Sequence, residues 1–215
     1  MPTFDPAQLR GRDIYLLMIG TIVPRPIAFV TSLNDAGVLN VAPFSYFNGI
    51  SSRPPLVSLS IGHRKLDGEL VKKDTLRNIE ASGEFVINIP SEDLAAQVNQ
   101  ASAEYPPDVS EVSETGLSTL PSEVVAPPRI AQCRVAMECK LEQVVMLGRP
   151  KALNGLVIGE VVRWHIDDSV WDAAASAVDI ETLRPLSRLG GSSFGKTREP
   201  FSLPRPDWAA KGIKS

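Results

Sequence analysis

The first half of the chain alternates short apolar runs with turn-forming residues, a pattern that predicts β-strands. Residues 26–33 are rich in β-branched and aromatic side chains, and they end at residues 34–37, where Asn, Asp and Gly favour a tight turn. A return strand is expected to start at Val38. Residues 56–61 and 84–89 are two further apolar runs of strand length. This half of the chain therefore predicts short strands joined by turns.

Two short helices are expected to interrupt the strands. Residues 73–82 carry apolar side chains at helical spacing, with Asp74 placed to act as the N-cap and Gly83 placed to end the helix. Residues 91–101 predict a second helix, with Ser91 as its N-cap.

The second half contains one long alternating segment. Residues 130–141 place apolar and charged side chains in turn, which predicts a strand with one buried and one solvated face. Residues 155–166 read as another strand, well placed to pair with the first. Cys133 and Cys139 both fall in the first of these segments, too far apart along a strand for a disulfide. We therefore expect two buried free thiols.

Proline is over-represented, with 18 prolines in 215 residues, which favours strands and ordered loops over a helical bundle. Residues 104–128 contain five of them with little periodicity, and residues 199–215 contain three. We expect a long ordered loop at the first segment and an extended tail at the second. The expectation is a single domain over residues 1–215, mainly β, with barrel architecture and a few peripheral helices.

Composition narrows the class of protein. A hydrophobic content of 43% argues against disorder, and a balance of 22 basic against 25 acidic residues argues against broad nucleic-acid binding. Residues 15–23 are apolar, but acidic Asp5 and Asp13 precede them and Pro24 ends them, unlike a secretory signal. No apolar stretch approaches the roughly 18 residues of a membrane span. We expect a cytoplasmic protein with no membrane and no nucleic-acid partner.

Residues 190–197 fit the phosphate-loop pattern G-x-x-x-x-G-K-[ST] letter for letter. That loop works only between a buried strand and a helix, and here prolines 200, 204 and 206 forbid a helix of useful length. We interpret the match as a coincidence. His63 and His165 are the only histidines and have no ligand-like spacing to Cys, Asp or Glu, so no metal site is expected. A Ser–His–Asp hydrolase has no G-x-S-x-G motif to support it.

Small polar side chains recur along the opening strands. An aromatic ring accompanies them at Phe44, and such a surface suits a flat heteroaromatic ligand with polar edges. Polar strand residues that face solvent explain the pattern equally well. From these residues alone, both interpretations stay open.

Several motifs in a fixed order favour the ligand-binding interpretation, because they resemble those of a known protein family. The chain resembles the flavin reductase-like family, whose members adopt the FMN-binding split β-barrel. The matching motifs include PRPIAFVTS at residues 24–32, NVAPFSYF at 40–47, KDTLRNI at 73–79, EFVINI at 84–89 and RLGG at 188–191. The resemblance implies a mainly β split barrel and FMN as the cofactor. Phe194 follows the RLGG motif where many members have tyrosine.

The resemblance also implies a flavin site. It assigns cofactor binding to Arg25, Thr31, Ser32, Asn40, Ala42, Pro43, Phe44, Ser45, Asn48, Lys73, Asp74, Thr75 and Arg188. Lys73 is the first candidate for the FMN phosphate, because it opens a helix whose dipole also favours an anion, and Arg25 is the second.

For the reaction, the resemblance implies hydride transfer from NADH or NADPH to the flavin, in a homodimer with the flavin at its interface and a small molecule as substrate. No catalytic acid or base is required, because the flavin carries the chemistry. Two alternatives stay open, namely a flavoprotein that oxidises or oxygenates its own organic substrate and a non-enzymatic flavin-binding protein.

Overall fold

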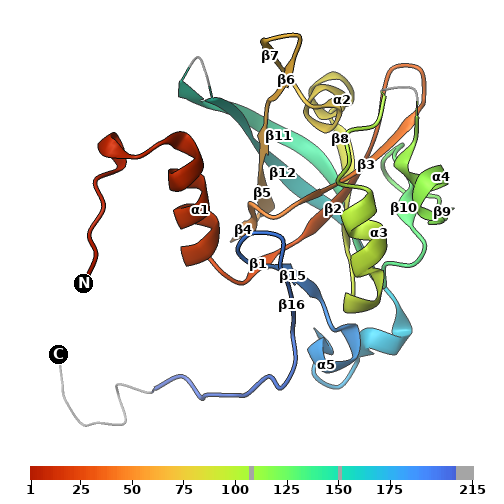
Figure 1. Ribbon diagram of the computed structural model, residues 1–215. Helices are drawn as coiled ribbons and strands as arrows, with labels where there is room; N and C mark the ends of the chain where they lie inside the picture. Colours follow the sequence, from red (N-terminus) through yellow and green to blue (C-terminus); the bar gives the residue numbers. More distant parts are fainter. Residues whose placement is uncertain (107–108, 150–151, 207–215) are drawn as a thin grey trace.

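The computed structural model describes residues 1–106, 109–149 and 152–206. At its centre lies a curled antiparallel sheet of seven strands in the order β3-β2-β8-β11-β12-β5-β4 (Figure 1). These strands are β2 (Ala28–Leu33), β3 (Leu39–Phe44), β4 (Phe47–Ser52), β5 (Pro55–Gly62), β8 (Glu84–Ile89), β11 (Val135–Arg149) and β12 (Ala152–Ile166). Val30 of β2 and Leu59 of β5 belong to one core cluster although they lie near opposite ends of the strand order. The sheet is therefore curled into a barrel around that core, and the mainly β expectation is confirmed.

The predicted turn after the first long strand is present. The Asn34 carbonyl accepts a hydrogen bond from Gly37 N at 2.9 Å, and the Asn34 side-chain oxygen accepts two more, from Ala36 N and Val38 N. Gly37 has a φ of +77°, which a residue with a side chain rarely adopts. The turn sets β3 beside β2, and β3 is the strand along which the candidate site lies.

Helix α2 (Asp74–Ser82) closes one end of the barrel, with Leu76 and Ile79 fully buried. Gly83 ends it in the left-handed conformation, as expected. The expected N-cap is wrong by one position: Lys73 occupies the N-cap position, and Asp74 is the first helical residue. The Asp74 carboxylate forms ion pairs with two arginines, which draws it away from the backbone of its own helix.

The prediction for residues 130–141 is wrong in two respects. Ile130 belongs to a separate short strand, β10 (Arg129–Ile130), and β11 begins only at Val135. Both faces of β11 are buried from Val135 to Cys139, including the charged Glu138, because a segment of the long loop covers the outer face. The expected pairing with β12 is confirmed, and neither cysteine forms a disulfide, although Cys133 is only half-buried.

The loop expected at residues 104–128 contains more regular structure than its prolines indicate. It holds helix α4 (Glu111–Thr115) and strand β9 (Thr119–Leu120), which pairs with β10. Before it, residues 91–101 form a 3-10 turn (Glu92–Leu94) followed by α3 (Ala95–Gln100). Ser91 is the N-cap residue as expected, although its side chain makes no capping hydrogen bond. Helices α3 and α4 lie on the outer side of β2 and β3 over a second core (Figure 1).

The remaining elements surround the barrel. They are α1 (Gly11–Thr21), α5 (Ile180–Leu183), 3-10 turns at Pro6–Gln8 and Asp168–Val170, and short strands β1 (Arg25–Pro26), β6 (Arg64–Leu66), β7 (Glu69–Val71), β13 (Trp171–Asp172), β14 (Ala177–Val178), β15 (Leu186–Arg188) and β16 (Phe194–Lys196). No helix among the described residues is long and apolar enough to cross a membrane.

The phosphate-loop match lies in a hairpin. Residues 190–193 form the turn between β15 and β16, and the described residues after Lys196 contain no helix. The segment therefore lacks the helix start that phosphate binding by this motif needs. Residues 199–206 run as an exposed segment without regular structure, and the rest of the expected tail lies outside the described residues.

Candidate functional site

A groove runs along the edge strand β3 and is made of two adjoining cavities, which share Pro43, Phe44 and Ser102. We name them the Lys73 cavity and the Phe194 cavity. The Lys73 cavity is lined by Asn40, Ala42, Pro43, Phe44, Arg64, Lys73, Asp74, Thr75, Ala101, Ser102, Ala103, Glu104, Tyr105 and Glu111. The Phe194 cavity is lined by Ile27, Pro43, Phe44, Ser45, Val98, Asn99, Ser102, Arg188 and Phe194.

Two cations lie in the Lys73 cavity, where α2 begins. Lys73 is half-buried, and its side chain makes no hydrogen bond or ion pair with any described residue. Arg64 forms a 3.5 Å ion pair with Asp74, yet its Nε is buried without a partner among the described residues. A buried unpaired N–H is costly unless a ligand satisfies it. The cavity therefore offers free cationic donors at a helix N-terminus, an arrangement that suits an anion.

Polar side chains from two other elements complete this cavity. The Asn40 amide donates to Thr75 Oγ1 at 2.8 Å, which ties β3 to the start of α2. Glu111 of α4 accepts a hydrogen bond from Val41 N at 2.7 Å. Burial raises the pKa of Glu111, the hydrogen bonds from the backbone of Val41 and of Glu111 itself oppose this, and the charge of Asp74 adds to the increase. The net effect is a raised pKa.

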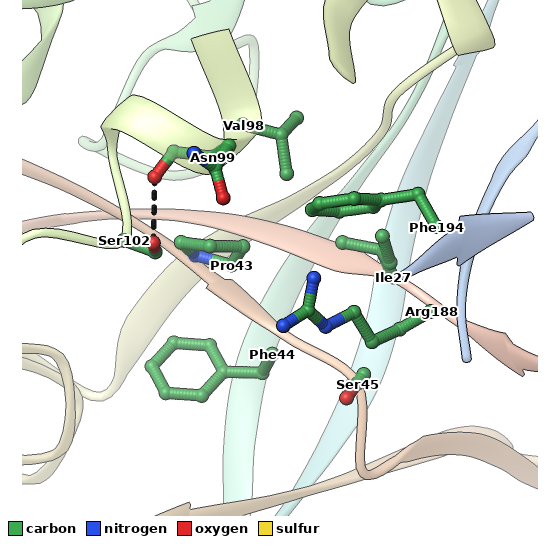
Figure 2. Close-up of a pocket in the computed structure, with 9 residues that line it drawn as sticks. All are labelled: Ile27, Pro43, Phe44, Ser45, Val98, Asn99, Ser102, Arg188 and Phe194. Carbon is green, nitrogen blue, oxygen red and sulfur yellow. Dashed lines mark hydrogen bonds between the residues drawn. The ribbon is translucent and has the colours of Figure 1, made fainter. Parts of the chain in front are cut away.

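The Phe194 cavity is mainly apolar, with one cation. The Arg188 guanidinium lies over the Phe194 ring, 4.4 Å from its centroid, and points into the space between Phe194 and Phe44 (Figure 2). Two carbonyls of the β15–β16 turn, those of Gly191 and Ser192, accept from its Nη2 and Nη1 at 3.0 and 3.2 Å. The guanidinium is therefore held in place while part of its donor set stays available to a ligand.

Arg25 occupies a different environment from the one expected. Its side chain is buried, and its guanidinium donates to the carbonyls of Ile19, Ile22 and Leu189 at 2.6–3.0 Å and to Ser45 Oγ at 3.3 Å. The side chain therefore fastens the end of α1 to the residue that follows β15. Nearly all of the Arg25 donors are therefore already used, and its role as the second candidate for the phosphate stays a prediction.

Arg25 also lines a third cavity, which we name the Tyr46 cavity. It is lined by Ile22, Pro24, Arg25, Pro26, Ser45, Tyr46, Phe47, Asn48 and Ser58. Ser45 also lines the Phe194 cavity, so the two cavities adjoin at this residue. The predicted residue Asn48 lies here and not in the groove itself.

Thr31 and Ser32 do not line the groove. Both are fully buried on β2, where the Thr31 hydroxyl donates to the Pro128 carbonyl at 2.7 Å and Ser32 Oγ accepts from the Asn78 amide at 3.2 Å. These hydroxyls hold the long loop and α2 in place, and the assignment of Thr31 and Ser32 to cofactor binding stays a prediction. Most of the other predicted residues line the groove, and their role in cofactor binding stays a prediction. They are Asn40, Ala42, Pro43, Phe44, Ser45, Lys73, Asp74, Thr75 and Arg188.

Sequence reasoning missed several lining residues. Arg64 precedes the KDT motif by nine residues, and its positive charge was the one feature that could have marked it as a candidate ligand for an anion. Asn99, Ser102 and Tyr105 come from α3 and the loop after it, where no motif marks them. No cluster of three metal-ligating side chains occurs among the described residues.

Comparison with known proteins adds independent information. The family model described as flavin reductase like domain matches residues 19–178. An uncharacterized protein of Halalkalibacterium halodurans is 44% identical over 206 residues, covering 94% of this chain and 95% of the relative. The structure of nitrilotriacetate monooxygenase component B from Bacillus cereus is similar with a TM-score of 0.88 and 39% identity, over 94% of this chain and 98% of that chain. The structure of Pseudomonas fluorescens 2-nitrobenzoate 2-nitroreductase is similar with a TM-score of 0.85 and 30% identity, over 96% of this chain and 98% of that one.

Proposed function

Since the chain belongs to the flavin reductase-like domain family, we propose that it is an FMN-dependent oxidoreductase that takes hydride from NADH or NADPH. The observation that carries this proposal is the β3 groove, which combines cationic side chains with free N–H donors at one end with apolar walls at the other. A phosphorylated flavin needs both features, because its phosphate is a strong anion and its ring system is flat and largely apolar.

The residues of the groove fit FMN in a definite way. Lys73 and Arg64 would hold the phosphate, assisted by the backbone N–H groups at the start of α2 and by the Thr75 hydroxyl. Pro43, Phe44 and Phe194 would exclude water from the ring, and Arg188 would provide a positive charge beside it. The chemistry that bound FMN would supply here is that of a hydride acceptor. The protein contributes binding, orientation and electrostatics, and no side chain is assigned as an acid or base.

The proposal is tested with purified protein reconstituted with FMN. A yellow protein that consumes NADH or NADPH, followed at 340 nm, is the expected result. Tight FMN binding without consumption of either nicotinamide would contradict the reductase activity and leave a flavin-binding protein. Lys73→Ala tests whether Lys73 takes part in FMN binding. Lys72→Ala is its matched control, because Lys72 is exposed and pairs with Glu80 outside the groove.

We further propose that the flavin site is completed by a second copy of the chain. Helix α1 exposes Tyr15, Leu16, Leu17 and Met18, and only Ile19 of the helix is buried. It stands at the side of the barrel (Figure 1), and edge strand β4 exposes a further apolar residue, Ile50. The Tyr46 cavity lies between α1 and β4 and continues into the groove through Ser45. A C2 dimer through this face would cover the apolar side chains and close the open side of the groove.

Light scattering of the purified protein tests the dimer. A dimer that dissociates when Leu16 and Leu17 are both replaced by Ser, with weaker FMN binding in the monomer, is expected. A wild-type monomer that binds FMN fully would contradict it.

One observation favours a second candidate function, a flavoprotein that oxidises or oxygenates its own organic substrate. Tyr105 and Glu111 bring the proline-rich loop to the wall of the Lys73 cavity. A reductase that only passes electrons to free flavin does not need such a wall. A change in the flavin absorbance on adding a small organic compound would favour this candidate.

A further inference from the structure

A cavity on another part of the molecule shares no lining residue with the flavin groove. It has a volume of about 330 Å³ and lies where the β9–β10 ladder meets the end of β12. Its lining includes Arg129, Arg134, Trp164 and His165, and we name it the Trp164 cavity. Its volume is within the usual range for small-molecule sites, which starts at roughly 300 Å³.

The two arginines of this cavity are held in place by backbone carbonyls. Arg129 donates from Nε and Nη2 to the Pro121 carbonyl, and Arg134 donates from Nη2 to the Leu183 carbonyl at 2.9 Å. These bonds use only part of each guanidinium, which has five N–H donors. Fixed guanidinium groups with free donors suit a carboxylate or phosphate, because little side-chain entropy is lost on binding.

A buried carboxylate orients the histidine of this cavity. Glu138 is fully buried, and its Oε1 lies 2.5 Å from His165 Nε2. His165 is partly exposed in the cavity wall, and its Nδ1 makes no hydrogen bond with any described residue. The Glu138 contact fixes the ring orientation and leaves Nδ1 as the nitrogen available to a ligand.

The remaining features complete a site for an aromatic anion. The Trp164 side chain is 48% exposed, a large apolar surface on which a planar ring can stack. Asp167 is the one acidic side chain in the lining, and its Oδ1 accepts a hydrogen bond from Ser169 N at 2.9 Å. The two arginines outnumber this one acidic side chain, whose charge interacts with that of Arg134.

From this geometry we propose that the Trp164 cavity binds a small aromatic molecule that carries a carboxylate or phosphate. The ring stacks on Trp164, and the oxyanion accepts from Arg129 and Arg134. The site works independently of the flavin groove, so its occupancy does not depend on the proposed reductase function.

The experiment uses full-length protein in which Trp171 and Trp208 are replaced by Phe, so that Trp164 is the only tryptophan. Its fluorescence is titrated with benzoate and with adenosine 5′-monophosphate, and calorimetry repeats both titrations on the FMN-saturated protein. Saturable quenching by at least one of the two anions is expected, with unchanged affinity when FMN is bound. Which anion binds identifies the oxyanion of the ligand. Benzamide and adenosine, which keep the rings without the charge, are expected to bind at least tenfold more weakly.

Variants separate the cavity from nonspecific binding. Arg134→Gln is expected to weaken the anion at least tenfold, whereas Arg163→Gln leaves it unchanged, because Arg163 is exposed on the same strand as Trp164 but pairs with Glu123 outside the cavity. Absence of saturable quenching by both anions would overturn the proposal. Equal loss in both variants, or displacement of the anion by FMN, would also overturn it.

Discussion

Replacing Glu138 with Gln tests how the long loop is held to the barrel. The Glu138 carboxylate accepts hydrogen bonds from the backbone N–H groups of Glu123, Val124 and Val125 at 2.6–3.0 Å, besides its contact with His165. Glutamine has nearly the same shape, but it lacks the charge and replaces one acceptor oxygen with a donor. That donor faces backbone N–H groups that then have no acceptor.

The expected loss follows from these contacts. Hydrogen bonds to a charged group contribute about 1.5–3 kcal/mol each, and breaking a buried charged cluster by removing one partner costs about 3–5 kcal/mol. We expect the free energy of unfolding at pH 7 to fall by about 3–5 kcal/mol. For a chain of this length, each kcal/mol lowers Tm by about 2–4 °C, so Tm is expected to fall by about 6–20 °C.

The pH dependence gives an independent check on the same group. Burial raises the pKa of Glu138, but hydrogen bonds from Glu123, His165, Val124 and Val125 outweigh it and lower the pKa to about 2. A carboxyl group with a lowered pKa stabilises the folded state above its unfolded pKa, near 4.5, and this contribution is lost as the pH falls toward 2. The difference between wild type and Glu138→Gln is therefore expected to be largest above pH 5 and to shrink between pH 4.5 and pH 2.

Urea unfolding followed by circular dichroism at pH 7, 4 and 3 measures both effects. Glu84→Gln is the matched control, because Glu84 accepts one hydrogen bond, from Ala126 N of the same loop, at a more exposed position. Its loss is expected to stay near 1 kcal/mol or less. A Glu138→Gln variant within 1 kcal/mol of wild type at pH 7, with the same pH dependence, would refute the reasoning.

Two further variants test the packing of the barrel and the interpretation of the glycine-rich turn. Gly159→Ala places a Cβ 2.5 Å from Phe85 Cζ, inside a closed core, so the free energy of unfolding is expected to fall by about 1–3 kcal/mol in a thermal unfolding experiment. An unchanged Tm would contradict this and would show that Phe85 can move aside. Lys196→Ala is expected to leave FMN affinity and nicotinamide oxidation unchanged, because Lys196 lies on the β15–β16 hairpin and lines none of the three cavities around the groove; a loss of activity in a steady-state assay would contradict this.

Local sequence signals were enough to predict most of the elements of the fold. The turn at residues 34–37 and the helix stop at Gly83 were predictable because each depends on a residue type with a specific backbone preference. The burial of Glu138 was not predictable, because the segment that covers it is distant in sequence and has no periodicity. Alternation along a strand shows which residues share a face, but it does not show what covers that face.

The same limit applies to the candidate site. The motif around Asn40–Ser45 and the KDT motif were both assigned to the flavin site by resemblance to the family, and the structure brings both to one groove. The position of Thr31 and Ser32 outside the groove was not predictable, because β2 has core on both of its faces. The burial of Arg25 was not predictable either, because most of its partners are backbone carbonyls, from residues 19, 22 and 189, which no sequence pattern reveals.

The central claim, that the β3 groove holds FMN with its phosphate at Lys73, is tested most directly by comparing FMN with riboflavin. Calorimetry on wild type, Lys73→Ala and Lys72→Ala gives the affinity of each protein for both ligands. Loss of one hydrogen-bonded charge pair predicts FMN binding weaker by roughly tenfold or more in Lys73→Ala, with riboflavin affinity nearly unchanged and Lys72→Ala equal to wild type for both ligands. Equal weakening of FMN and riboflavin in Lys73→Ala, or unchanged FMN affinity, would contradict the account.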